Sequence, residues 1–171
     1  MNNPKNTVQA AQLPIEKLRP FEGHPFKVTD DAEMEQLVWS ILTQGLLTPI
    51  TVRLLENNEY EVISGHRRLH ACQKAGIETV PALIYTLDRD AAAIALVDSN
   101  LHREKILPSE KAFAYKLKLD AIKHQGKTSR HVVGKLESAD CVSKGESGRQ
   151  VQRYIRLTEL IPEILQMVDD G

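Results

Sequence analysis

The spacing of apolar and polar positions changes near the middle of the chain. In the first half, apolar residues recur at helical spacing after Asp31 and stop before Gly45, which predicts a helix between these residues. A second helix is predicted to start after Gly65 and to close at Gly76. Short apolar stretches bounded by polar turns predict strands at residues 50–55, 60–64 and 79–85. Pro81 favours an edge position or a bulge for the last of these strands.

The second half of the chain has no strand pattern, and its apolar residues follow helical spacing. The predicted helices span residues 90–102, 108–126, 128–136, 147–160 and 162–170, with a polar loop at residues 137–146. The expected fold class is therefore α+β, with a small α/β domain followed by an all-α domain. We place the boundary so that the first domain comprises residues 1–106 and the second residues 107–171.

Composition excludes several classes of protein. No stretch approaches the ~20 apolar residues that span a bilayer, and the polar start has no apolar signal region. These features predict a cytoplasmic protein with no membrane partner. Cys72 and Cys141 lie far apart and in no CxxC motif, so neither a disulfide framework nor a zinc site is expected.

Charge is distributed unevenly, although the net charge is only −1. Residues 1–99 carry 9 basic and 13 acidic side chains, whereas residues 100–160 carry 13 basic and 7 acidic ones. The basic second half favours a polyanionic partner. A solvated face of lysine-rich helices would give the same pattern, and charge alone leaves both interpretations open.

The segment Gly65-His66-Arg67-Arg68 lies where a predicted strand passes into a predicted helix. The first turn of a helix offers backbone N–H groups and the positive end of the helix dipole. Gly65 lets an anion approach the backbone, and the two arginines add charged donors for phosphate oxygens. Because arginines in a first turn oppose the dipole unless an anion is present, the pattern favours a phosphate site over a plain basic helix start.

A second polar segment runs from Ser99 through Asn100 to Arg103. Asn100 has a neutral oxygen that a hydrated Mg²⁺ tolerates, and Arg103 offers a further phosphate partner. By itself the segment favours a plain helix end, in which side chains four residues apart form pairs.

Both segments, in this order, resemble the nucleotide-binding boxes of the ParB (RepB-like) family of chromosome and plasmid partition proteins. Residues 64–71 (SGHRRLHA) are similar to its G-E-R-R-x-R-A box, and residues 99–110 to its E-N-x-x-R-x-x-L-x-P-x-E box. Residues 45–52 (GLLTPITV) resemble its G-L-x-x-P-I-x-V segment, and residues 24–27 lie where the family has an N-P-rich loop. Four boxes in register are more specific than any one of them.

The resemblance implies a sequence-specific DNA-binding partition protein with a ParB-type nucleotide-binding domain and a helix-turn-helix domain. It implies CTP and Mg²⁺ as cofactors, a ParA-type ATPase as partner, and a homodimer. The dimer would close as a clamp on palindromic, centromere-like double-stranded DNA and slide along it. The residues that the resemblance assigns to the nucleotide are Ser64, Gly65, His66, Arg67, Arg68, Ser99, Asn100 and Arg103, with Asn100 also at the metal.

Two positions depart from the family pattern. His66 stands where the first box has Glu, and Ser99 stands where the second box has Glu. The second of these acids is associated with metal or water handling, and Asp98 is rotated from its position by ~100° on a helix. The missing acid therefore weighs against the slow CTP hydrolysis that the family implies more than against CTP binding. We assign no catalytic residue.

Residues 128–136 and 147–160 are interpreted as a helix-turn-helix. Arg and Gln side chains of the second helix suit base edges in the major groove, and polar residues near the first helix suit phosphates. The predicted DNA-binding residues are Lys127, Ser129, Arg130, Ser147, Arg149, Gln150, Gln152, Arg153 and Arg156. The intervening loop, residues 137–146, is longer than the usual turn of ~3–4 residues.

Other functions stay open. Related domains include nucleases and the phosphotransferase sulfiredoxin, but no carboxylate cluster accompanies the boxes, and Ser64-Gly65-His66-Arg67 lacks the cysteine of sulfiredoxin's G-C-H-R motif. A helix-turn-helix transcription regulator that never slides would have the same sequence features. Because the chain stops at the end of a predicted helix, where the family continues, we expect the natural protein to be longer and to carry a C-terminal dimerisation part.

Overall fold

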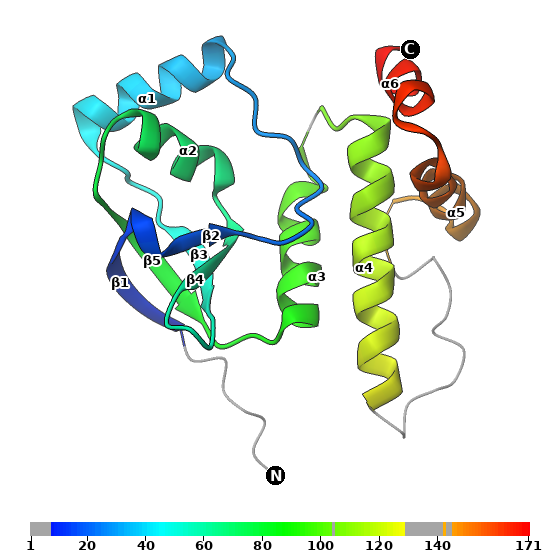
Figure 1. Cartoon of the computed structure of the whole chain (residues 1–171), viewed down its shortest axis with the longest axis horizontal. Helices are drawn as coiled ribbons and strands as arrows, with labels where there is room; N and C mark the ends of the chain where they lie inside the picture. Colours follow the sequence, from blue (N-terminus) through cyan, green and yellow to red (C-terminus); the bar gives the residue numbers. More distant parts are fainter. Residues whose placement is uncertain (1–7, 104, 129–141, 143–144) are drawn as a thin grey trace. The chain divides into compact units, whose positions relative to one another are not determined.

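The chain forms two compact units, Met1–Asp88 and Arg89–Gly171, in a computed structural model (Figure 1). The structure describes residues 8–103, 105–128, 142 and 145–171. The boundary predicted from the sequence lies later, after residue 106. The difference arises because helix α3 (Arg89–Asn100) packs against the helix that follows it and so belongs to the second unit.

The first unit is built on a mixed five-stranded sheet in the order β1-β5-β3-β4-β2. The strands are β1 (Val8–Pro14), β2 (Leu18–Pro20), β3 (Ile50–Leu54), β4 (Tyr60–Ser64) and β5 (Thr79–Tyr85). Strand β5 pairs antiparallel with β1 and parallel with β3, while β4 pairs antiparallel with β3 and parallel with β2. The three predicted strands are confirmed as β3, β4 and β5.

The position of Pro81 differs from the prediction. Strand β5 lies in the interior of the sheet, and its register with β1 runs without a shift through Pro81 and Gln12. Pairing with β3 begins only at Ala82, so Pro81 is paired on one side. Proline cannot donate to a ladder, and it is tolerated most easily where a strand is paired on one side only.

Two helices complete the first unit, α1 (Ala32–Gln44) and α2 (His66–Lys74), and both are predicted from the sequence. Asp31 caps α1 by accepting a hydrogen bond from the Met34 backbone N–H, and Gly45 ends it with a φ of +74°. The helices lie side by side (Figure 1). Their inner faces pack with the sheet into one aliphatic core, whose buried members include Met34, Ile41, Ile50, Val52, Val62, Leu69, Cys72 and Val80.

The second unit is helical. Its described elements are α3, α4 (Pro108–Thr128), α5 (Gly148–Arg156), a 3-10 turn (Leu157–Glu159) and α6 (Pro162–Asp170). Tyr115 and Leu119 of α4 form a small core with Val142 and with Val151 of α5. The backbone N–H and the hydroxyl of Ser109 donate to the Asp169 carboxylate at 2.9 and 2.5 Å, which fastens α6 to the start of α4.

Of the predicted helix at residues 128–136, only Thr128 is described, and it is the last residue of α4; residues 129–136 lie outside the described residues. Within the described ranges, no helix is long and apolar enough to span a bilayer.

Candidate functional site

Helix α2 begins directly after strand β4, at Gly65. This residue has a φ of +103°, in the left-handed region, and serves as the N-cap of α2. A Cβ added there would lie 2.8 Å from Cγ2 of Ile50, closer than packed carbon atoms approach. Glycine is therefore demanded both by the backbone angle and by close packing against β3.

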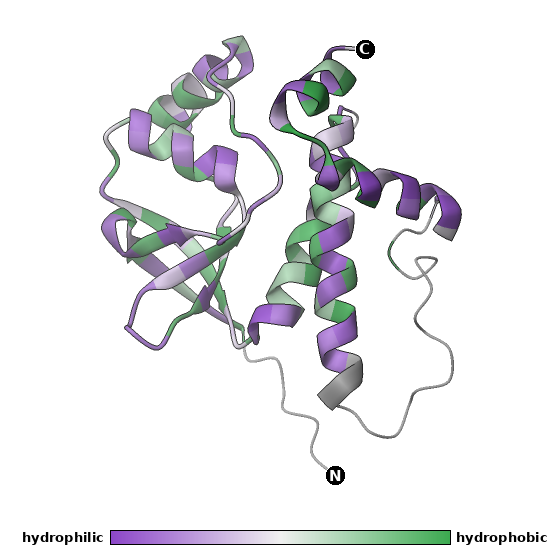
Figure 2. Ribbon diagram, turned by 45° about the vertical axis from the view of Figure 1, so that its right-hand side comes forward, coloured by the Kyte–Doolittle hydropathy of each residue, from purple (hydrophilic) through white to green (hydrophobic). Residues whose placement is uncertain are grey.

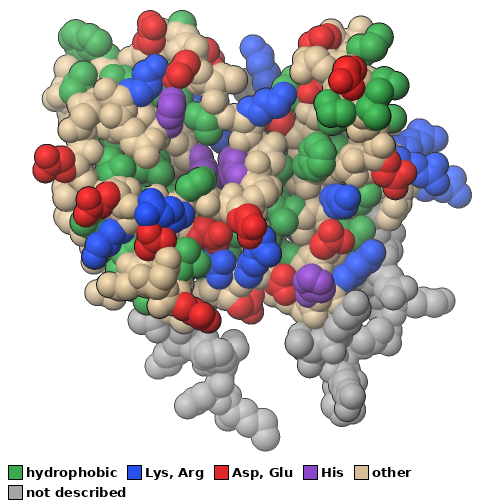
Figure 3. All heavy atoms as spheres, in the orientation of Figure 1, with side chains coloured by type: hydrophobic (Ala, Val, Ile, Leu, Met, Phe, Trp, Pro, Cys, Tyr) green, Lys and Arg blue, Asp and Glu red, His purple; other side chains and the backbone are tan. Residues whose placement is uncertain are grey.

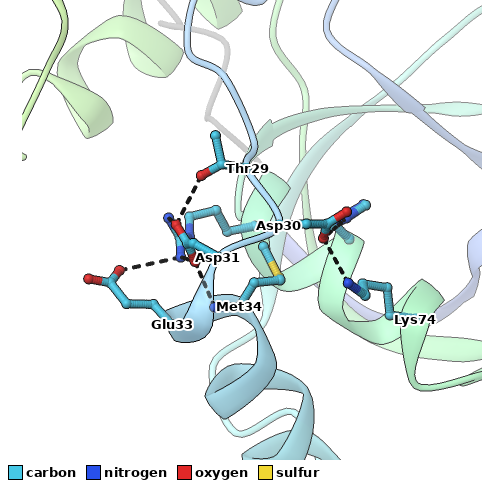
Figure 4. A network of polar contacts seen from close by, with 8 residues as sticks. Thr29, Asp30, Asp31, Glu33, Met34 and Lys74 are labelled. Atoms are coloured by element: carbon cyan, nitrogen blue, oxygen red, sulfur yellow. Dashed lines mark hydrogen bonds and ion pairs between the residues drawn. The ribbon is translucent and has the colours of Figure 1, made fainter.

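Arg67, in the first turn of α2, is held by carboxylates of helix α1. Its Nη2 lies 3.1 Å from Oδ1 of Asp31 and 3.4 Å from Oε2 of Glu33, and its Nη1 lies 3.5 Å from Oδ2 of Asp31. Figure 4 shows Asp31 and Glu33 converging on one guanidinium group. We call Arg67, Asp31 and Glu33 the Arg67 cluster.

Arg68 has different surroundings. Its Nη1 donates to the backbone oxygens of Thr48 and Pro49, each at 2.6 Å. The side chain is half-buried, and this burial lowers the pKa of Arg68. Arg68 thus ties the loop before β3 to helix α2.

A second ion-pair group fastens α1 to α2. The Asp30 carboxylate lies 2.8 Å from Nζ of Lys74 and 2.9 Å from Nε2 of His70. The hydrogen bond from Lys74, followed by the one from His70, lowers the pKa of Asp30. The pKa of Asp31 is also lowered, first by the hydrogen bond from the Met34 N–H and then by the Thr29 hydroxyl, with a smaller part from Arg67. Both carboxylates are therefore charged at neutral pH.

These contacts change the electrostatic argument for an anion site. From the sequence, an external anion is expected because two arginines oppose the dipole of α2. The structure instead supplies acceptors from the chain itself: two carboxylates for Arg67 and two carbonyl oxygens for Arg68. No local pattern in the sequence marks Asp31 and Glu33 as partners of Arg67, because they lie 36 and 34 residues away.

His66, which replaces the family's Glu, lies against the loop at residues 24–27. Its ring centroid is 3.7 Å from that of His24, with 39° between the ring planes. The start of this loop is held by Glu61 of β4, which is buried, accepts a hydrogen bond from the Glu22 N–H at 3.4 Å and pairs with Nε of Arg53 at 2.6 Å.

The structure thus brings three of the four family-like segments together at the start of α2. Residues 24–27 reach it through His24, residues 45–52 through Thr48 and Pro49, and residues 64–71 form the helix start itself. Ser64 is the last residue of β4.

The fourth segment belongs to the second unit, at the end of α3. Ser99 is exposed and donates its hydroxyl to the Leu96 carbonyl at 2.9 Å. Asn100 is buried, and its Nδ2 lies 2.8 Å from the same carbonyl oxygen and 3.2 Å from Oγ of Ser99. Arg103 is exposed just beyond the helix. The side chains of Ser99 and Asn100 therefore lie together, and the backbone N–H of Arg103 donates to the Asn100 carbonyl. The roles of the three residues at nucleotide and metal stay predictions.

Few described side chains around this segment could bind a metal ion. Asp98 is engaged by Nζ of Lys118 at 2.5 Å. Among the residues that the structure describes, no three His, Cys, Asp or Glu side chains gather as a metal site.

Helix α5 presents the polar face that the sequence predicts. Ser147 caps the helix by accepting a hydrogen bond from the Gln150 N–H at 3.4 Å, and Val151 is buried. Figure 2 shows α5 as largely hydrophilic, and Figure 3 shows basic side chains projecting where it lies. The outward orientation is confirmed for Arg149, Gln150, Gln152, Arg153 and Arg156, all of which are exposed.

The other predicted DNA contacts lie elsewhere. Lys127 is in the last turn of α4, and its side chain lies outside the described residues, as do Ser129 and Arg130.

Comparison with known proteins identifies the family. Residues 1–101, more than half of the chain, match the sequence model of the ParB N-terminal domain. The chain belongs to this family. The resemblance noted in the sequence is thereby confirmed, and the fold is α+β with a ParB-like first part.

Its relatives include nucleoid occlusion proteins. The one from Bacillus mycoides (strain KBAB4) is 37% identical over 154 residues, which are 90% of this chain and 49% of that protein. The chain therefore spans about half the length of the curated relatives that it matches.

Two solved structures of C-terminally truncated ParB from Caulobacter crescentus are also similar. One is complexed with CTP-γ-S; it is 27% identical with a TM-score of 0.51, and the match covers 95% of this chain and 86% of that one. The other is complexed with the centromeric parS site; it is 26% identical with a TM-score of 0.56, over 91% of this chain and 75% of that one.

Proposed function

We propose that this chain is a DNA-binding partition or nucleoid occlusion protein whose first unit binds CTP at the start of α2. The observation that carries the proposal is the meeting of three family-like segments at one helix N-terminus, through His24, Thr48, Pro49 and residues 64–68. A Caulobacter protein of the same family is solved with a CTP analogue and with centromeric DNA, which supports both ligands.

The residues at the start of α2 fit a phosphate group. The first turn contains no acidic residue, and helix N-termini bind phosphate through backbone N–H groups and the dipole. In the proposal Arg67 binds phosphate oxygens directly, while Arg68 shapes the adjoining loop through its two carbonyl partners. Ser64 and His66 border the site from β4 and from the His24 loop.

The family resemblance also assigns Ser99, Asn100 and Arg103 to the nucleotide, and this assignment belongs to the proposal. The amide oxygen of Asn100 suits a hydrated Mg²⁺, because this ion keeps several waters and takes few protein ligands besides substrate phosphates. Bound Mg²⁺ would neutralise part of the triphosphate charge. Hydrolysis is not part of the proposal, because Ser99 offers no carboxylate where the family has one.

Helix α5 would carry DNA recognition. Arginine and glutamine side chains form bidentate contacts with guanine and adenine edges in the major groove, and α5 exposes five such residues along nine positions. A homodimer on a palindromic site, clamp closure with sliding, and a ParA-type ATPase partner follow from the family and belong to the proposal. A nucleoid-associated position in the cytoplasm would follow from DNA binding.

The nucleotide site is tested by calorimetry of CTP, ATP and GTP with Mg²⁺, with and without a palindromic parS-like duplex. We expect a preference for CTP and at least a tenfold loss of affinity in Arg67→Ala, since a charged hydrogen bond to phosphate is worth about 1.5–3 kcal/mol. Arg19→Ala is the matched control, because Arg19 is an exposed arginine of the same unit that pairs with Glu59. No preference for CTP in any condition would overturn the proposal.

A further inference from the structure

The two arginines at the start of α2 are held by groups of different kinds. Arg68 donates at 2.6 Å to two backbone oxygens, which are neutral and belong to the chain that leads into β3. Arg67 instead faces two side-chain carboxylates across distances of 3.1 to 3.5 Å. Only the second arrangement pairs a guanidinium with anions, and another anion can take their place.

The carboxylates of the Arg67 cluster differ in how firmly they are placed. Asp31 accepts hydrogen bonds from the Met34 N–H at 2.8 Å and from the Thr29 hydroxyl at 2.9 Å, so its position is set by the cap of α1. Glu33 has 81% of its side chain exposed and lies 3.4 Å from Nη2 of Arg67. A change of partner would therefore move Arg67, whose side chain is 28% exposed, while Asp31 stays in place.

We propose that Asp31 and Glu33 are internal counter-anions, which occupy Arg67 until a nucleotide triphosphate replaces them. This inference rests on the proposed nucleotide site at the start of α2. The carboxylates oppose binding twice, because they engage the guanidinium that phosphate needs and because their charges repel the incoming anion. They thereby set the affinity below the value that the arginine would give alone.

The decisive variant is Asp31→Asn, because asparagine caps a helix as well as aspartate does and removes only the charge. The matched control is Asp30→Asn. It removes the same charge from the neighbouring residue, whose carboxylate pairs with His70 and Lys74 and not with Arg67. CTP is titrated with Mg²⁺ at fixed ionic strength, and circular dichroism checks that helix content is unchanged.

We expect Asp31→Asn to bind CTP about three- to tenfold more tightly, as removing one partly exposed charge near an anion implies. Glu33→Gln should give a smaller gain, and Asp30→Asn a change below about twofold. In an Arg67→Ala background, Asp31→Asn should give a smaller gain, because only the repulsion between the carboxylate and the nucleotide is then removed.

The outcomes separate the inference from the proposed function. If wild type binds CTP and Asp31→Asn binds it equally or more weakly, the carboxylate positions Arg67 rather than competing for it, and the inference fails alone. An equal gain in Asp30→Asn would also overturn it, because the effect would then be one of general charge. If neither wild type nor any variant binds CTP, the proposed function fails and the inference with it.

Discussion

The arginines of α2 and of α5 have opposite surroundings. At the start of α2, Arg67 faces two carboxylates and Arg68 two carbonyl oxygens, all from the same unit. On α5, Arg149, Arg153 and Arg156 are exposed, and no residue in the described part of the chain forms an ion pair with them. Basic segments that look similar in the sequence therefore differ in whether an acid of the described chain pairs with them.

The physical reason lies in what packs beside each helix. Helix α1 lies against α2 and brings the acids of its first turn to the basic turns of its neighbour. Helix α5 packs on α4 through Val151. The acid just before α5, Glu146, forms an ion pair with Lys111 of α4 and accepts a hydrogen bond from the Tyr115 hydroxyl. Glu146 therefore pairs with α4 and not with the arginines on the outer face of α5.

The largest expected effect concerns the outer face of α5. Replacing Arg149, Arg153 and Arg156 together with Ala should weaken binding to a parS-like duplex at least about 100-fold, since each such contact is worth about 1–3 kcal/mol. Fluorescence anisotropy at fixed salt measures the affinity. The thermal midpoint should hardly change, because the three side chains are exposed.

The control for this change is Arg19→Ala, which removes a basic charge from the first unit and should leave DNA affinity nearly unchanged. A loss below about threefold in the triple variant would break the comparison, because α5 would then not be the surface that binds DNA.

The start of α2 should tolerate change less well than the surface of α5. In Gly65→Ala, the new Cβ would sit on a residue with a φ of +103° and would lie 2.8 Å from Cγ2 of Ile50. We expect the free energy of unfolding to fall by about 2–4 kcal/mol. Gly76→Ala is the matched control, since its φ is +70° but no atom lies within 4 Å of the added Cβ. We expect it to cost about 1 kcal/mol in urea unfolding. Equal costs would show that packing against Ile50 does not matter.

A smaller effect separates the two arginines of α2. Arg68→Ala leaves two carbonyl oxygens without their donor, which should lower the free energy of unfolding by about 1–3 kcal/mol. Arg67→Ala breaks only part-exposed ion pairs and should cost less than about 1 kcal/mol. Urea unfolding of both variants tests this order, and the reverse order would contradict a structural role for Arg68.

The smallest effect is a dependence on acid. The pKa of Asp31 is lowered in the folded state, first by the Met34 N–H, so the unfolded chain takes up a proton at higher pH than the folded one. The stabilisation is therefore present above the ordinary Asp pKa of about 3.9 and is lost as the pH falls below it. Melting from pH 2.5 to 7 should show a difference between wild type and Asp31→Asn at neutral pH that vanishes in acid. A difference that is constant with pH would argue against a charged role for Asp31.

The sequence by itself was enough for features whose signals are local. Helices α1 and α2 were marked by Asp31, Gly45 and Gly76, and strands β3, β4 and β5 by apolar stretches between polar turns. The family boxes and the outward face of α5 were also visible, because helical spacing determines which residues share a face. Capping, periodicity and turn chemistry act over a few residues, so a one-dimensional pattern contains them.

The tertiary structure decided what depends on distant partners. The interior position of β5 and the pairing of the three-residue β2 with β4 follow from strand order, which leaves no periodic signal in the chain. The partners of Arg67 lie 34 and 36 residues away on another helix. Whether an arginine is satisfied within the chain or left for a ligand is settled by which helix packs beside it, and only the folded structure determines that packing.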